Sequence, residues 1–410
     1  MRKYYTHLTL IFLGLILYLM ANFQRVAIPG AIFDSLQLDL SLQAYQVTVL
    51  GSIFMYFYAL GLLFSGVLVD RFGPIKVIMG GSLLFVIGSL IFPNTNNINL
   101  LYFSRAILGF GAASFYLSLV NEVKKCFPDK YFSICISLML ITGYIGGFCA
   151  NAPFIVILKH FSWQYVLNVV GIIALIACLL FYAERTFLHH IPKNEHASFS
   201  LKPFKEVLTN KQNYNLFAFG SLNYGLYYVI QTVIGVKFLK DFVCLSPNKA
   251  SLILSFMIVI AGLSGLSMAS LSSFLHNKRV IFMKIICFMS AAFFAIISLC
   301  ITFDIKTPFI AVILLLIAIS GGMTPLILPV LNSYNKYEIR STALSIMDSF
   351  FFITVGILGN IVGIFLNLFP TTINKFGYLI YSKNSYLIIF LTFFICSLVE
   401  MFFVLKLKDI

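Results

Sequence analysis

The chain has 410 residues, of which 60% are hydrophobic and only 10% are charged. Soluble proteins carry about 25% charged residues, so no soluble fold could bury this much apolar surface, and the surrounding solvent must be lipid. The formal net charge of +14 would suggest a nucleic-acid partner for a soluble protein, but here the charge follows membrane topology and indicates no such partner.

Twelve apolar segments are long enough to cross a bilayer as helices, which predicts an all-α membrane protein. The expected spans are 8–28, 45–69, 75–92, 98–121, 133–158, 163–184, 214–236, 247–270, 280–303, 307–331, 341–367 and 384–405. With the N-terminus in the cytoplasm, most Lys and Arg residues fall in cytoplasmic loops and tails. This bias obeys the positive-inside rule and predicts that both termini are cytoplasmic.

The longest polar interval, residues 185–213, has six spans before it and six after it. We therefore expect an N-terminal six-helix bundle over 1–184, a cytoplasmic linker over 185–213 and a C-terminal six-helix bundle over 214–410. A weak internal repeat supports this division. The Lys-Val-Ile run at 76–78, after the second span, matches the Arg-Val-Ile run at 279–281, after the eighth.

The first span carries polar residues on one face. Tyr18, Asn22 and Arg25 stand at positions i, i+4 and i+7, which places them on the same side of a helix. A charged or amide side chain at membrane depth is costly and normally faces a partner or a wet cavity. This face predicts part of a substrate pocket, with plain helix packing as the alternative for its aromatic member.

The stretch 66–76, between the second and third spans, is the only densely charged segment in its neighbourhood. Gly66 would allow a close approach between backbones, and Gly73 would allow a tight turn. Asp70 could cap the next helix or pair with a cationic group, and Arg71 follows it directly. The alternative is an ordinary turn that carries a charge pair.

The fourth span contains Arg105, followed by small residues at 109, 111, 112 and 113 that would let helices pack closely. These glycines do not fit a dinucleotide-binding loop, since no strand precedes them. Arg25 and Arg105 together would make an electropositive chamber. Because guanidinium groups bind carboxylates and phosphates through paired hydrogen bonds, we expect a substrate that bears a carboxylate.

The seventh span repeats the spacing of the first, since Tyr224, Tyr228 and Gln231 also stand at i, i+4 and i+7. We expect these three residues to bind substrate, and helix packing is again the alternative. In the tenth span, the glycines and proline at 321–325 suggest a flexible or broken helix rather than ligands.

Asp348 lies well inside the eleventh span. Burial of a carboxylate favours its protonated form, so this group could load and release protons. We expect Asp348 to couple transport to the proton gradient or to pair with a substrate amine. A structural partnership with a neighbouring polar side chain is the alternative. Glu400 is expected at the membrane interface, and Glu122 is expected at a helix end beside cytoplasmic loops.

The eight cysteines are scattered singly, and the six histidines lie in loops or at helix ends. Their spacing suggests no metal site, no disulfide framework and no nucleophile with a neighbouring base. We therefore expect no metal, no cofactor and no enzyme activity.

The pattern G-x-L-x-D-R-x-G at 66–73 and the pattern R-x-x-x-G at 105–109 resemble two motifs of the major facilitator superfamily of transporters. The resemblance covers the whole chain and implies two pseudo-symmetric six-helix bundles, with helices 1, 4, 7 and 10 around a central cavity. The sequence departs from the first motif at Pro74 and Ile75, where members usually carry basic residues. The resemblance implies a gating role, closing the cytoplasmic side in the outward-facing state, for Gly66, Asp70, Arg71 and Gly73.

The end of the first span, which reads Phe-Gln-Arg-Val-Ala-Ile-Pro at 23–29, resembles a bacterial subgroup with an Arg-Val-x-Pro element at this place, although here two residues separate the valine from the proline. Its members include phagosomal amino-acid transporters of intracellular bacteria, and the segment more remotely resembles lysosomal dipeptide carriers. The fifth span lacks the Gly-Pro pattern that is usual in exporting antiporters, which favours uptake. The resemblance implies a monomer in the bacterial inner (plasma) membrane.

Three function classes follow from these features. The first is a proton-coupled importer of amino acids, short peptides or related small carboxylates. The second is a proton-antiport exporter of drugs or of a carboxylate siderophore, which an aromatic-rich cavity would also serve. The third, a sensor or a membrane enzyme, is disfavoured because the sequence offers neither a sizeable signalling domain nor a catalytic cluster.

Overall fold

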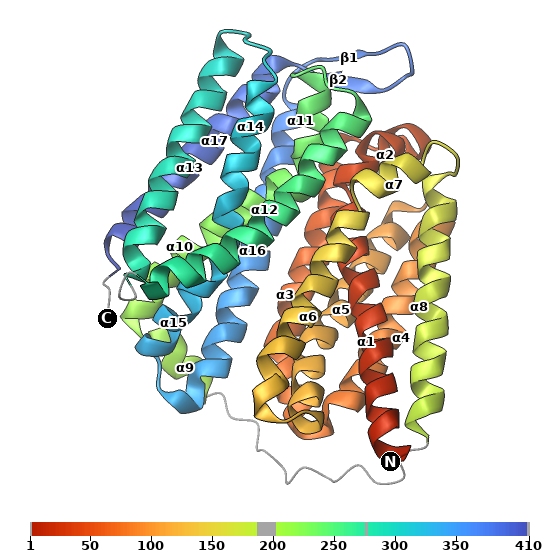
Figure 1. Cartoon of the computed structure of the whole chain (residues 1–410). Helices are drawn as coiled ribbons and strands as arrows, with labels where there is room; N and C mark the ends of the chain where they lie inside the picture. The colour runs from red at the N-terminus through yellow and green to blue at the C-terminus, as the bar shows by residue number, and fades with distance from the viewer. Residues whose placement is uncertain (1, 187–201, 275–277, 408–410) are drawn as a thin grey trace. The chain divides into compact units, whose positions relative to one another are not determined.

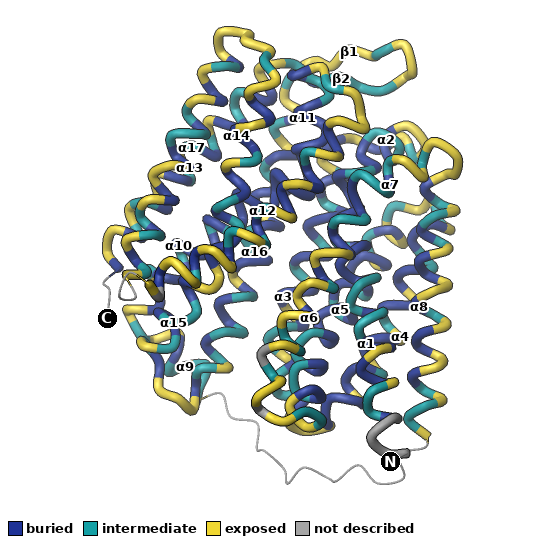
Figure 2. Tube along the Cα trace, viewed as in Figure 1, coloured by how far each residue is buried: buried dark blue, intermediate teal, exposed yellow. Residues whose placement is uncertain are grey.

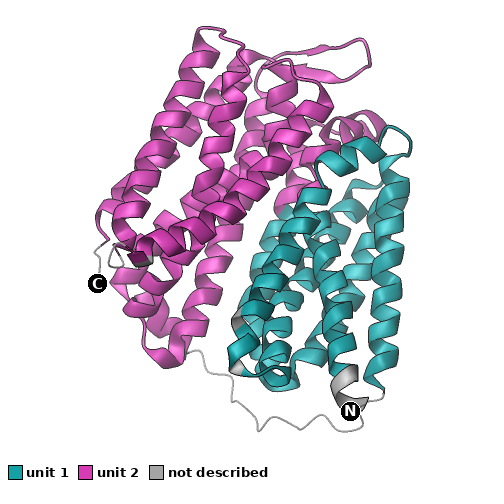
Figure 3. Ribbon diagram, in the orientation of Figure 1, with its two compact units in different colours: residues 1–25, 53–200 teal, residues 26–52, 201–410 magenta. Residues whose placement is uncertain are grey.

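The computed structural model describes residues 2–186, 202–274 and 278–407 (Figure 1). Half of the expected linker, 187–201, therefore lies outside the described residues. The chain forms two compact units (Figure 3). Unit 1 comprises Met1–Arg25 and Ile53–Ser200, and unit 2 comprises Val26–Ser52 and Leu201–Ile410. The short segment that follows the first span thus packs with the second half of the chain.

Unit 1 consists of apolar helices whose backbone groups bond within each helix, as a lipid solvent requires. α4 packs along α5, and a Cβ added at Gly111 would lie 2.5 Å from the carbonyl oxygen of Gly81. The small residues of the fourth span thus bring two backbones together, as predicted. The elements are α1 (Arg2–Ala27), α3 (Ala44–Phe72), α4 (Pro74–Ile91), η2 (Phe92–Asn94), α5 (Ile98–Cys126), α6 (Asp129–Cys149), α7 (Ala152–Ile157) and α8 (Trp163–Arg185).

Unit 2 also contains the last residues of α1 and the first turns of α3. Its helices are longer on average than those of a soluble domain, and several of them are interrupted. The elements are η1 (Gly30–Ile32), α2 (Phe33–Leu40), α9 (Lys202–Thr209), α10 (Lys211–Val229), η3 (Ile230–Ile234), α11 (Gly235–Asp241), α12 (Pro247–Phe274), α13 (Arg279–Thr302), α14 (Phe309–Ile317), η4 (Ala318–Gly322), α15 (Thr324–Tyr334), η5 (Tyr337–Ile339), α16 (Arg340–Asn367), β1 (Thr371–Ile373), β2 (Leu379–Tyr381) and α17 (Lys383–Leu405).

Two expected spans of unit 2 are broken in the structure. The tenth span changes from α14 to the 3₁₀ turn η4 and then to α15, which confirms the break predicted from its glycines and proline. The seventh span changes from α10 to the π-helix η3 and then to α11, which the sequence analysis did not predict. π-Helices are rare and occur frequently at functional sites.

Eleven helices among the described residues are long and apolar enough to cross a membrane, and they coincide with eleven of the twelve expected spans. The remaining span, 214–236, is the one divided among α10, η3 and α11. Over residues 2–186, 202–274 and 278–407 the fold is all-α except for the antiparallel hairpin of β1 and β2, in which Thr371 pairs with Tyr381. Along the spans, buried and exposed positions alternate (Figure 2). The exposed ones include apolar residues such as Phe12 and Leu266, as expected of helices that face lipid.

Candidate functional site

The polar face of α1 forms as the sequence predicts. The Asn22 side-chain amide donates to the Tyr18 carbonyl at 2.8 Å, and Arg25 donates to the Asn22 side-chain oxygen at 2.5 Å. The Tyr18 ring lies 5.8 Å from the ring of Tyr116 on α5, and the Arg25 guanidinium lies 5.6 Å from the ring of Tyr58 on α3. Arg25 is only half-buried. Its fork of donors can therefore bind an anion that approaches this face.

Arg105 lies in a different environment, fully buried inside unit 1. Its guanidinium is 4.7 Å from the ring of Phe54 and 5.8 Å from the ring of Phe92. One nitrogen donates to the carbonyl of Gln24 at 3.3 Å. These contacts tie α5 to α1, α3 and η2, and in this structure they leave no accessible face of Arg105 for a ligand.

The predicted face of α10 is an aromatic stack in unit 2. The rings of Tyr224 and Tyr228 lie 5.1 Å apart, and Tyr224 also stacks at 5.2 Å on Phe351 of α16. Gln231 follows in the π-helix η3 and is buried. Its side-chain nitrogen has no hydrogen-bond partner among the described residues, so this amide is available to a ligand.

Asp348 stands three residues before Phe351 on α16, so both lie on one side of that helix. The tyrosine stack of α10 contacts the same stretch of α16. Asp348 is half-buried, and within the described parts of the chain it takes part in no ion pair. The candidate coupling acid therefore lies on α16 one turn before the phenylalanines that contact the candidate binding tyrosines of unit 2.

In the loop between α3 and α4, the structure confirms the tight turn predicted at Gly73 but not the close approach predicted at Gly66. Gly73 has φ of +81°, the backbone conformation that favours glycine, and its N–H donates to the Val69 carbonyl, which makes the tight turn. The close approach expected at Gly66 is wrong, because an added Cβ would meet only Leu117 at an ordinary 3.8 Å. α3 and α5 approach more closely more than one helical turn earlier, where a Cβ added at Gly61 would lie 2.6 Å from the Ala113 Cβ.

The two charged residues of that loop are exposed. Asp70 and Arg71 both face outward at the end of α3, and the Arg71 guanidinium lies 5.3 Å from the ring of Phe72. This outward position at a helix end suits a contact that depends on conformation, as a gate requires.

Unit 2 contains a buried ion cluster that the sequence analysis missed. The Lys237 ammonium, only 2% exposed, lies 2.7 Å from Asp34 and 3.1 Å from Asp241, and Lys240 also pairs with Asp34. The Asp241 carboxylate accepts hydrogen bonds from the Tyr381 N–H at 3.0 Å and from the Tyr386 hydroxyl at 2.8 Å. The i, i+4 spacing of Lys237 and Asp241 was the one signal in the sequence.

The two carboxylates of this cluster have opposite pKa shifts. Burial acts to raise the pKa of Asp34, but Lys237 and Lys240 outweigh it and hold that pKa below its usual value. Burial dominates at Asp241 and raises its pKa, although Lys237 acts against it. The cluster therefore joins α2, α11 and the β1–β2 hairpin through one strongly ionised acid and one weaker acid.

Two further acids lie in places that the sequence did not predict. Glu122 of α5 contacts His7 of α1, with 2.5 Å between His7 Nδ1 and a carboxylate oxygen, instead of facing a cytoplasmic loop. Glu400 is fully buried rather than interfacial, because Asn223 of α10 and Cys287 of α13 donate to it at 3.0 and 2.8 Å.

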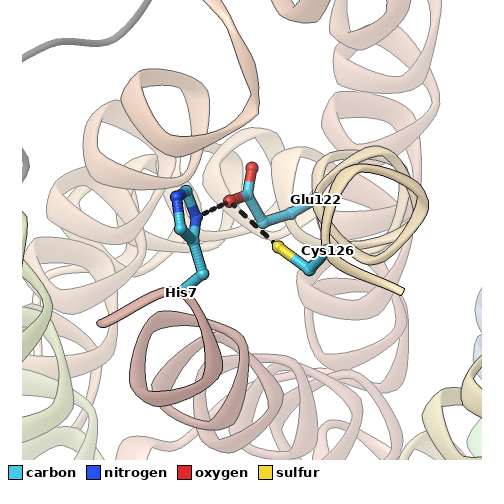
Figure 4. A group of neighbouring side chains, drawn as sticks. All are labelled: His7, Glu122 and Cys126. Atoms are coloured by element: carbon cyan, nitrogen blue, oxygen red, sulfur yellow. Dashed lines mark hydrogen bonds and ion pairs between the residues drawn. The ribbon is translucent and has the colours of Figure 1, made fainter. Parts of the chain in front are cut away.

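His7, Glu122 and Cys126 form a compact group of possible metal ligands (Figure 4). Two ligand atoms bound to one tetrahedral Zn²⁺ would lie about 3.4 Å apart. The His7 nitrogen and the Glu122 oxygen are much closer than that, whereas the Cys126 sulfur is 3.9 Å from the same oxygen. The geometry fits a hydrogen-bonded pair that joins α1 to α5.

The chain matches the family model of the Major Facilitator Superfamily over residues 10–360. Among curated proteins, it is 26% identical over 193 residues to an uncharacterized transporter of Buchnera aphidicola subsp. Schizaphis graminum, which covers 46% of each chain. It is 30% identical over 119 residues to the putative multidrug resistance protein MdtD of Serratia proteamaculans, which covers 28% of this chain and 25% of the relative. The matches thus span less than half of these relatives.

Solved structures share the fold along nearly the whole chain. A bacterial homolog of the human lysosomal transporter Spinster, inward-facing and unoccupied, aligns with a TM-score of 0.74 at 14% identity, covering 98% of this chain and 96% of that one. The nucleoside transporter NupG aligns with a TM-score of 0.69 at 18% identity, covering 98% and 100%. Because the family model matches residues 10–360, well over half of the chain, this protein belongs to the major facilitator superfamily of multi-pass membrane transporters and not to an enzyme family.

Proposed function

We propose that this transporter takes up amino acids, short peptides or related small carboxylates together with protons, by alternating access. The observation that carries the proposal is the half-buried Arg25 on α1, held beside Asn22 and near Tyr18 and Tyr58. A guanidinium that is fixed by neutral groups and still accessible is suited to a carboxylate, which it can bind through two hydrogen bonds. We place the protein as a monomer in the bacterial inner membrane with both termini in the cytoplasm.

Asp348 supports the proton-coupling part of the proposal. It stands three residues before Phe351, on which Tyr224 of α10 stacks. The Gln231 side-chain nitrogen, which has no hydrogen-bond partner in the described part of the chain, follows Tyr228 by three residues. A half-buried carboxylate beside a binding surface can exchange a proton when the surface changes its exposure. In the same position, the ionised Asp348 carboxylate could instead bind the amine of a substrate.

The alternative is proton-antiport export of drugs or of a carboxylate siderophore. The name of the Serratia proteamaculans relative favours it, although that match covers only 28% of this chain. Stacked aromatic rings such as Tyr224 and Phe351 could hold flat apolar compounds.

Transport by the purified protein in liposomes tests the proposal. Labelled amino acids, dipeptides and small carboxylates would be offered with and without an inward-directed proton gradient. Arg25→Ala should raise the half-saturating concentration of a carboxylate substrate by about tenfold or more, because hydrogen bonds to charged groups contribute about 1.5–3 kcal/mol. Arg25→Lys keeps the charge and should lose less, and Lys306→Ala, at an exposed site of unit 2, is the matched control.

Asp348→Asn should abolish accumulation driven by the proton gradient and leave exchange of internal for external substrate partly intact. Full accumulation by this variant would remove Asp348 from the mechanism. Unchanged affinity of Arg25→Ala for every anionic substrate would refute the carboxylate site. Efflux of drugs from loaded vesicles, without any uptake of the panel, would establish the exporter instead.

A further inference from the structure

Unit 1 contains a groove of about 520 Å³ between α3, α4 and α5. The two serines that line it do not make it polar. The Ser65 hydroxyl donates to the Gly61 carbonyl at 2.7 Å, and the Ser114 hydroxyl donates to the Gly111 carbonyl at 2.7 Å. Since both hydroxyls donate to backbone carbonyls, the walls offer hydrocarbon to an occupant.

The groove exists because α4 has a glycine at its centre. Lys76, Gly80 and Leu83 stand at i, i+4 and i+7, on one exposed face of α4. A Cβ added at Gly80 would meet no atom within 4 Å, whereas one at Gly81 would lie only 1.8 Å from the Ser114 hydroxyl. Gly81 therefore serves helix packing, and Gly80 leaves open space.

The charge of the groove is confined to one end. Lys76 lies in the first turn of α4, and Arg71 lies over the ring of Phe72, which lines the groove. The α3 side is formed by positions 61, 65, 68 and 72, one turn apart. Asp70 stands two residues from both 68 and 72, so it points away from the groove.

This cationic end is the end of unit 1 at which α1 begins. α4 and α5 are neighbours that run in opposite directions, and Glu122 near the end of α5 contacts His7 near the start of α1. From Phe72 to Gly61 the groove runs eleven residues along α3, which is about 16 Å at the rise of an α-helix.

We propose that this groove binds an anionic phospholipid, with one acyl chain along α3 and α4 and the phosphate at Lys76 and Arg71. A volume of about 520 Å³ lies within the range of small-molecule sites. A free phosphate would use only the cations and leave the apolar walls uncovered, whereas a lipid buries hydrocarbon there and pairs its charge at the polar end. The site adjoins the loop of Asp70 and Gly73, so its occupant also touches the candidate gate.

Photo-crosslinking tests the proposal with the full-length protein in detergent micelles. The probes are phosphatidylglycerol and phosphatidylcholine that carry a diazirine in one acyl chain, and the adducts are mapped to peptides. We expect phosphatidylglycerol to label residues of α3 and α4 more than those of other spans. Lys76→Gln should reduce that labelling about fivefold, which corresponds to the contribution of one cation near a membrane surface.

Gly80→Phe places a ring in the groove from a position where the added Cβ meets no atom within 4 Å, so the variant should fold and lose the labelling by both lipids. Leu266→Phe, at a 69% exposed position of α12, is the matched control and should change nothing. Excess inorganic phosphate should not compete; if it competes as well as phosphatidylglycerol, the groove is an anion site and not a lipid site. Equal labelling by both lipids that is insensitive to Lys76→Gln, or labelling that survives Gly80→Phe, would overturn the proposal.

Discussion

The two units each bury a cation, and they stabilise it in different ways. In unit 1, Arg105 lies between the rings of Phe54 and Phe92 and donates to a backbone carbonyl. In unit 2, Lys237 lies between the carboxylates of Asp34 and Asp241. A delocalised guanidinium is weakly hydrated and stacks on aromatic faces, whereas a compact ammonium needs oxygen ligands around it.

The difference has a consequence for function. Stacked rings and a carbonyl do not change charge, so the surroundings of Arg105 stay the same over a wide pH range. The surroundings of Lys237 change when either acid takes a proton. Unit 2 therefore holds a buried cluster that responds to pH, and it joins the segment after the first span to α11.

The largest effect is expected from Lys237→Met. The substitution keeps the volume of the side chain but leaves the buried carboxylates of Asp34 and Asp241 without their shared cation. Loss of one partner from a buried ion pair destabilises by about 3–5 kcal/mol. Thermal unfolding of the purified protein in detergent measures this loss. The triple variant Asp34→Asn, Lys237→Met, Asp241→Asn should recover most of it, and no recovery would mean that packing and not charge explains the loss.

A smaller loss is expected from Arg105→Met. The variant gives up the stacking on Phe54 and Phe92 and one long hydrogen bond of 3.3 Å to a carbonyl, but unlike Lys237→Met it leaves no buried charge without a partner. The same unfolding assay should place its midpoint between those of the wild type and Lys237→Met. A loss as large as that of Lys237→Met would show that the two cations do not differ in the way described above.

Local patterns in the sequence predicted those features that depend on helix periodicity. The faces of Tyr18, Asn22 and Arg25 and of Tyr224 and Tyr228 form as expected, because residues three or four apart meet on any helix. The break in the tenth span and the turn at Gly73 followed from glycine and proline chemistry. The roles of these residues in binding and gating stay predictions.

The features that were missed depend on contacts between distant parts of the chain. Asp34 and Lys237 are far apart in sequence, and the same is true of His7 and Glu122. No local sequence pattern therefore predicts either pair. Glu400 looked interfacial because it lies near the end of its span, but partners on two other helices bury it. The π-helix η3 was missed as well, because helix propensities do not distinguish a π-helix from an α-helix.

The stability of unit 2 should depend on pH through the two acids of the ion cluster. The folded-state pKa of Asp34 is lowered, so its stabilising contribution is complete above about pH 4 and is lost as the pH falls through the folded value. The pKa of Asp241 is raised, so protonating it favours the folded state as the pH falls toward about 4. The unfolding midpoint should therefore fall steeply only in strong acid. Asp34→Asn should flatten that fall, and Asp241→Asn should remove the change at milder pH.

The smallest effect is expected at an exposed pair of unit 2. Lys336 lies 3.0 Å from Glu206 of α9, and this contact raises the pKa of the Lys336 ammonium. Water already solvates both groups, so little free energy depends on their pairing. Lys336→Ala should unfold with the same midpoint as the wild type within the scatter of the assay, at low and at high salt. A lower unfolding midpoint at low salt that returns to the wild-type value at high salt would contradict this expectation. It would mean that exposed ion pairs stabilise unit 2 as well as the buried cluster around Lys237.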